Sequence, residues 1–149
     1  MKNEFSEIID FAIDKEKEAI DFYNELKIRE KMPHVIKVLD DIINMEKGHI
    51  NKLKFFKNNL PNIRNIEKLE SIKLIDYYEE PIHYENLDFI ALLRIAIKRE
   101  DQSRRLYQAL ADNTDEQSIK EVFILLANEE EEHKQLFEHI YQDKVLIDN

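Results

Sequence analysis

Apolar residues recur at intervals of three and four positions along four long stretches of this chain, a spacing that places them on one face of an α-helix. The pattern predicts helices over residues of about 6–29, 33–57, 87–111 and 115–141. Pro33 suits the first turn of the second helix. The run from Thr114 to Gln117 is typical of a capping box, which would start the fourth helix near that point.

Between the second and third helices, from about residue 58 to 86, the pattern is lost. Pro61 and Pro81 interrupt it, and only residues 67–78 are compatible with a short helix. This stretch is therefore expected to be a long connection. The tail after about residue 141 is expected to be short and loosely held.

Each predicted apolar face is interrupted by residues that seldom lie in a core. The first and third helices carry a lone glutamate there, and the second and fourth carry Glu-x-x-His, whose two side chains point the same way one turn apart. Burying a charge is costly unless it is paired or bound to a metal ion, so these residues are candidate metal ligands. They are Glu16, Glu46, His49, Glu100, Glu130 and His133.

Their neighbours receive simpler interpretations. Lys15 and Lys17 are interpreted as part of a solvated face, and Gly48 as a point of close packing. A further Glu-x-x-His match, Glu80 to His83, is rejected because Pro81 prevents a continuous helix. The remaining histidines lie off the ligand faces and are interpreted as surface residues: His34, His83 and His139.

The two halves of the chain repeat with a shift of 84 residues. The shift superposes Glu16 on Glu100, Glu46 on Glu130 and His49 on His133, together with much of the apolar pattern. Each half is thus a predicted helical hairpin with one set of candidate ligands. A network of acids and histidines without metal is the alternative, although four buried carboxylates would then repel one another.

Two such hairpins predict an all-α four-helix bundle in a single domain spanning 1–149. Short connections make the helices of each hairpin antiparallel neighbours. The connection of about thirty residues is long enough to run back along a helix of ~25 residues, which is ~37 Å long. The second and third helices are therefore expected to be parallel and joined by a crossover.

Composition argues against several classes of partner, location and metal site. The chain has 149 residues, a net charge of −10 and no dense basic patch, which argues against nucleic acid as a partner. No apolar stretch is long enough to span a bilayer or to act as a signal peptide, so a cytoplasmic location without membrane attachment is expected. The absence of cysteine excludes iron–sulfur and zinc–thiolate sites within this sequence.

These motifs resemble the ferritin-like di-iron carboxylate proteins and, within them, the rubrerythrin family. The residues that carry the resemblance are the six candidate ligands with Phe22, Tyr23, Leu106 and Tyr107 beside them. Two features depart from typical rubrerythrins. The rubredoxin-like domain with its cysteine-bound iron is missing, and Ser103 stands where many members carry an extra glutamate ligand used in peroxide reduction.

The resemblance implies a site with two iron ions, while manganese or zinc would also suit the donor atoms. Glu16 and Glu100 would be terminal ligands, Glu46 and Glu130 would bridge, and Tyr23 and Tyr107 would donate hydrogen bonds around the ligands or serve only as core residues. The implied function is an oxidoreductase of oxidative-stress defence. It would reduce peroxide or O₂ with electrons from a separate rubredoxin-like donor and form a homodimer. A ferroxidase or iron-handling bundle is one alternative, and a helical interaction module with a vestigial site is another.

Overall fold

The computed structural model describes residues 4–59 and 67–148, so Pro61 lies outside the described residues. Four long helices form the molecule: α1 (Phe5–Arg29), α2 (Pro33–Asn58), α4 (Phe89–Asp112) and α5 (Gln117–Asp148). Three short helical segments lie between α2 and α4: α3 (Glu67–Glu70), η2 (Leu74–Tyr77) and η3 (Tyr84–Asn86). No strand occurs in the described parts of the chain, and the predicted all-α class is confirmed.

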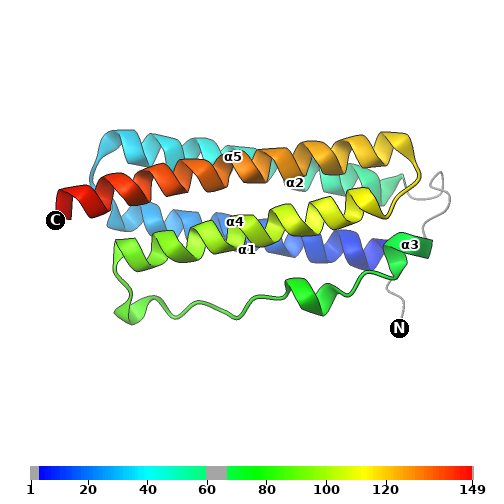
Figure 1. The fold of residues 1–149 in the computed structure, drawn as a ribbon, viewed down its shortest axis with the longest axis horizontal. Helices are drawn as coiled ribbons and strands as arrows, with labels where there is room; N and C mark the ends of the chain where they lie inside the picture. Colours follow the sequence, from blue (N-terminus) through cyan, green and yellow to red (C-terminus); the bar gives the residue numbers. More distant parts are fainter. Residues whose placement is uncertain (1–3, 60–66, 149) are drawn as a thin grey trace.

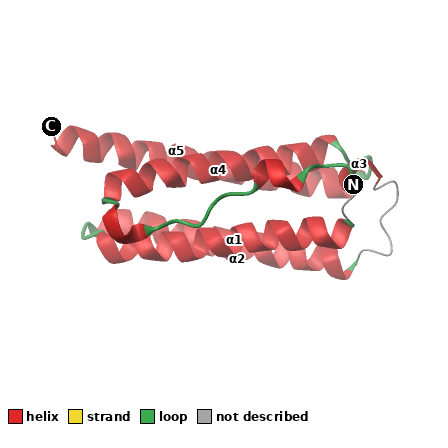
Figure 2. Cartoon of the chain, turned by 90° about the horizontal axis from the view of Figure 1, so that it is seen from below, coloured by secondary structure: helices red, strands yellow, loops and turns green. Residues whose placement is uncertain are grey.

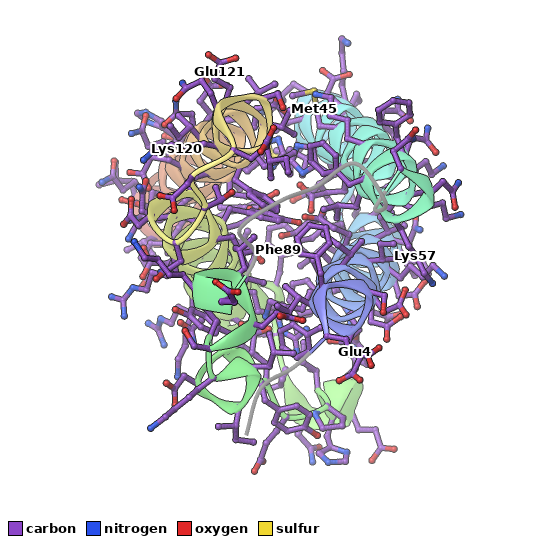
Figure 3. All side chains as sticks on the ribbon, turned by 90° about the vertical axis from the view of Figure 1, so that its right-hand side faces the viewer. Glu4, Met45, Lys57, Phe89, Lys120 and Glu121 are labelled. Atoms are coloured by element: carbon purple, nitrogen blue, oxygen red, sulfur yellow. The ribbon has the colours of Figure 1, made fainter. Side chains whose placement is uncertain are left out.

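The predicted topology is also confirmed. The helices α1 and α2 form one antiparallel hairpin, and α4 and α5 form the other (Figure 1). The connection between the hairpins runs along the bundle beside α1 and α4, so that α2 and α4 point the same way (Figure 2). Viewed end-on, α1 faces α4 and α2 faces α5 around a common interior (Figure 3). None of the described helices has a stretch apolar enough, over enough residues, to span a bilayer.

Local signals explain most helix boundaries. Pro33 lies in the first turn of α2, as predicted. Asp88 precedes α4 and its carboxylate accepts a hydrogen bond of 2.8 Å from the backbone N–H of Ala91, which satisfies one free donor of the first turn. The region predicted as a possible helix over residues 67–78 is instead divided between α3 and η2.

The fourth predicted helix begins close to the expected residue, but its predicted cap and its predicted end were wrong. It begins at Gln117, and the hydroxyl of Thr114 accepts from the backbone N–H of Glu116 at 3.3 Å, so the expected capping box does not start the helix. It also continues to Asp148 and not to about residue 141. The added turns are held by tertiary contacts, because Lys144 forms an ion pair of 2.8 Å with the buried carboxylate of Glu30.

Two apolar clusters fill the bundle on either side of its centre. One joins the start of α1 to the ends of α2 and α4 and includes Phe5, Ile9, Leu53, Leu110 and Phe123. The other lies toward the opposite end and includes Phe22, Leu26, Leu39, Leu92 and Phe137. The candidate ligands lie between these clusters in the sequence of every long helix. Apolar layers at both ends therefore separate the central polar residues from bulk water.

Cationic side chains of the bundle attach the crossover, among them Arg29 on α1, which donates to the carbonyl of Tyr84 at 3.1 Å. Lys15 on α1 donates to the carbonyl of Tyr77 at 2.9 Å, and Arg99 on α4 donates to the carbonyl of Glu80 at 3.0 Å. Both also pair with the carboxylate of Glu79, at 3.7 Å and 3.3 Å respectively. Lys15 is 9% exposed, so its interpretation as a solvated residue was wrong: the crossover covers it.

Candidate metal centre

The six predicted ligands meet at the middle of the bundle. All are buried, with exposed fractions of 1–3%. Each of the four long helices contributes at least one of them, because their positions fall on the inward faces that the apolar periodicity defines. The structure thus brings together residues as far apart in sequence as Glu16 and His133.

The six side chains form two overlapping groups of possible ligands. Glu16, Glu46, His49 and Glu130 make the first group, and Glu46, Glu100, Glu130 and His133 make the second. Within each group one donor atom per residue lies within 4.8 Å of the others. Glu46 and Glu130 belong to both groups, which is the arrangement that two bridging carboxylates would require.

Both histidines turn the same ring nitrogen toward the carboxylates. Nδ1 of His49 lies 2.8 Å from Oε1 of Glu130, and Nδ1 of His133 lies 2.9 Å from Oε1 of Glu46. The two imidazole rings are nearly parallel, with 6.1 Å between their centroids. Each histidine therefore approaches a carboxylate on the other hairpin, so both hairpins are needed to complete either group.

Every one of the six residues has a buried polar atom that makes no hydrogen bond of suitable geometry, although Nδ1 of His49 and Nδ1 of His133 lie 2.8 Å and 2.9 Å from carboxylate oxygens of the other hairpin. These atoms are Oε2 of Glu16, Oε1 of Glu46, Nδ1 of His49, Oε2 of Glu100, Oε1 of Glu130 and Nδ1 of His133. An unsatisfied buried polar group costs about 1–3 kcal/mol, and more when it is charged. Carboxylate oxygens and imidazole nitrogens gathered in one buried place are suitable ligands for cations.

The pKa values reflect the same crowding. Burial and the charges of Glu16 and Glu100 raise the pKa of Glu46 well above its usual value. Burial and the neighbouring carboxylates raise the pKa of Glu130 in the same way. Glu16 differs, because contacts with Glu46, His49 and Tyr107 outweigh burial and lower its pKa. The two shared glutamates are thus the ones that most need a positive charge to stay ionised.

Two tyrosines hold the outer glutamates across the bundle. The hydroxyl of Tyr107 on α4 donates to Oε1 of Glu16 on α1 at 2.5 Å, and the hydroxyl of Tyr23 on α1 donates to Glu100 on α4. Burial and the nearby carboxylates raise the pKa of both tyrosines well above the usual value, so both remain protonated donors. The sequence left two interpretations open for these tyrosines, and both hydroxyls make the hydrogen bonds that the first one requires. Their pairing across the hairpins was not visible in the sequence.

One residue beside the centre was not predicted from the sequence. Nε2 of His49 forms a hydrogen bond of 2.7 Å with Oε2 of Glu129 on α5. Glu129 opens a run of four glutamates whose chemistry is identical, so only the position of α2 distinguishes it. Its place directly before Glu130 was the available signal, since that position lies beside the inward face.

Other residues near the motifs lie outside the centre. His34, His83 and His139 are exposed, as predicted, and the segment around Glu80 and His83 is not helical. Ser103 is partly exposed one turn after Glu100 and adds no carboxylate. Gly48 is not closely packed: an added Cβ would meet no atom within 4 Å, so that interpretation was wrong.

A four-helix bundle with a long crossover and a buried set of four glutamates and two histidines is the architecture of ferritin-like carboxylate proteins, and such a set could hold metal ions. A sequence model of the rubrerythrin family matches residues 1–57 and 91–147, which is most of the chain and leaves out the crossover. The chain belongs to the rubrerythrin family. Comparisons with curated proteins and with solved structures yield no match.

Proposed function

We propose that this protein holds two iron ions at the bundle centre and reduces peroxide or O₂ with electrons from a separate donor. The observation that carries the proposal is the set of four glutamates and two histidines, all buried, whose donor atoms form two overlapping ligand groups at the bundle centre. Four carboxylates supply four negative charges, which two divalent cations would neutralise. Family membership favours iron, while manganese and zinc also suit these donors.

Each protein group has a distinct role in this proposal. Glu46 and Glu130 would each help to hold both ions, because both residues belong to the two ligand groups. Glu16 and Glu100 would each hold one ion, and the tyrosine hydroxyls hold these two carboxylates in position. Two ferrous ions bound there would supply the pair of electrons that reduces one peroxide. The apolar clusters on both sides of the centre would exclude large molecules and admit only small ones such as these oxidants.

Electrons must then come from outside this sequence. The 149 residues contain no cysteine that could hold a second iron centre. A rubredoxin-like protein is the proposed donor, and a two-fold homodimer is the proposed assembly. Turnover is therefore expected only when an external reductant is added.

Oxidation and handling of iron itself is the second candidate function. Ser103 is the observation that favours it, because the chain lacks the extra glutamate that the peroxide chemistry of many family members uses. The oxidant preferred by the reduced centre distinguishes the two functions.

Stopped-flow absorbance on the anaerobically reduced, iron-loaded protein tests the proposal. H₂O₂ is expected to reoxidise the centre faster than O₂ at equal concentration. His133→Ala should slow this step, and the exposed His83→Ala is the matched control. Faster reoxidation by O₂ would favour the iron-oxidising function, and equal effects of the two variants would contradict the ligand assignment.

A further inference from the structure

The two halves of the chain supply matching ligands but different partners for the two histidines. His49 has Glu129 on its Nε2 atom at 2.7 Å, and the other oxygen of Glu129 lies 3.8 Å from Nζ of Lys52. The 84-residue repeat places Met45 at the position equivalent to Glu129. Among the described residues, the ion pairs of His133 with carboxylates run through Nδ1, to Glu46 and Glu100, and none is found through Nε2.

Met45 cannot support His133 in the way that Glu129 supports His49. Met45 is 39% exposed and lies on α2, on the side of the bundle away from the crossover (Figure 3). A thioether is at most a weak acceptor and carries no charge, so it cannot replace a carboxylate on an imidazole N–H. The difference between these two equivalent positions therefore lies in the sequence itself.

A carboxylate on the outer nitrogen changes how an imidazole binds a cation. By accepting the Nε2 proton, Glu129 fixes the tautomer in which Nδ1 of His49 has a free lone pair facing the centre. It also holds the ring in place and makes Nδ1 a stronger donor. His133 presents Nδ1 to the same centre without this support.

We propose that Glu129 is a positioning residue that makes the two metal positions unequal, so that the first ion enters the group containing His49. The position containing His133 then fills at a higher metal concentration. This inference rests on the proposed function, because it requires that the centre bind metal. It adds an order of filling that the two matching ligand sets do not themselves imply.

Titration of the chelator-treated full chain with Co²⁺, followed by calorimetry and by cobalt absorption, tests the inference. The protein should bind two ions in two resolved steps. Glu129→Ala should weaken the tighter step by about 10–100-fold and leave the weaker step unchanged. Glu129→Gln should retain part of the affinity, since an amide oxygen still accepts the hydrogen bond. Glu132→Ala is the matched control, because Glu132 is exposed on the same helix.

Double variants identify which position is affected. Glu129→Ala should have no further effect in a His49→Ala background and should keep its full effect in a His133→Ala background. Met45→Glu provides a gain-of-function arm at an exposed site, and it should tighten the weaker step toward the stronger one. This arm keeps the inference testable if Glu129→Ala reduces folding.

The outcomes separate the inference from the proposed function. Two tight steps that Glu129→Ala leaves unchanged, or weakens equally, would overturn the inference while leaving a metal centre in place. An effect of Glu129→Ala that persists in the His49→Ala background would also overturn it. Absence of tight binding by the unaltered chain would overturn the proposed function itself.

Discussion

Removal of metal should make the stability of this protein fall as the pH rises. Without cations the four central carboxylates face one another, and the pKa values of Glu46 and Glu130 rise because of burial and of neighbouring negative charge. The folded chain then binds protons that the unfolded chain releases above the usual glutamate value of 4.5. The stabilisation that these bound protons provide is fully present below pH 4.5. It is lost as the pH rises toward the raised pKa values of Glu46 and Glu130.

The magnitude follows from the number of protons involved. Each proton bound only by the folded state gives a slope of about 1.4 kcal/mol per pH unit, so the two glutamates together contribute at most about 2.8 kcal/mol per unit. His49 acts in the same direction: burial opposes its charge, but Glu16 and Glu129 outweigh burial and raise its pKa. Glu16 acts oppositely, and only on the acid side, because its pKa is lowered.

Metal should reverse this dependence. An ion at 100 times its dissociation constant adds about 2.7 kcal/mol to the free energy of unfolding. For a chain of this size that corresponds to roughly 5–10 °C in melting temperature. Because ligands must be deprotonated to bind, the difference between metal-loaded and metal-free protein should widen from pH 5.5 to 7.5.

The assay is urea unfolding of chelator-treated and Mn²⁺-loaded protein at several pH values. The double variant Glu46→Gln, Glu130→Gln should show a flatter pH dependence without metal and no stabilisation by Mn²⁺. Glu132→Gln, an exposed change on α5, should behave like the unaltered chain. Metal-free protein whose stability stays constant or increases over this pH range would refute the reasoning.

Three further predictions follow from the geometry. Anaerobic loading with Fe²⁺ should give two ions per chain at ~3.5–4 Å separation, as in two-metal centres generally, and anomalous scattering would locate them; one ion or fewer by elemental analysis would count against this. Tyr107→Phe and Tyr23→Phe should each lower the free energy of unfolding, measured by urea titration, by about 1.5–3 kcal/mol, the range for hydrogen bonds to charged groups. Tyr141→Phe is the control: it removes a hydroxyl that accepts from Arg94 at an exposed site, and it should lower the free energy of unfolding by less. Gly48→Ala should raise the free energy of unfolding by about 0.5–1 kcal/mol, because the added methyl meets no atom within 4 Å and alanine favours the helix; a thermal melt showing a loss would mean that the position is not open.

Local pattern was sufficient for the four helices and for the six candidate ligands. Helical periodicity needs only neighbouring residues, and a polar residue on an apolar face is visible without knowing what it faces. The repeat of 84 residues then indicated that both hairpins serve one centre. The helix ends were less predictable, since the end of α5 depends on the ion pair between Lys144 and Glu30, which are distant in sequence.

The sequence by itself determined which side chains face inward, because that depends on spacing within one helix. Only the tertiary structure decided which side chains from different helices meet. Lysine is usually a surface residue, but Lys15 is buried because the crossover passes over it. Glu129 is chemically the same as Glu131 and Glu132, and it contacts His49 because α2 lies beside that edge of α5. The tyrosines donate across the bundle because α1 faces α4, a relation between helices that no spacing along one helix encodes.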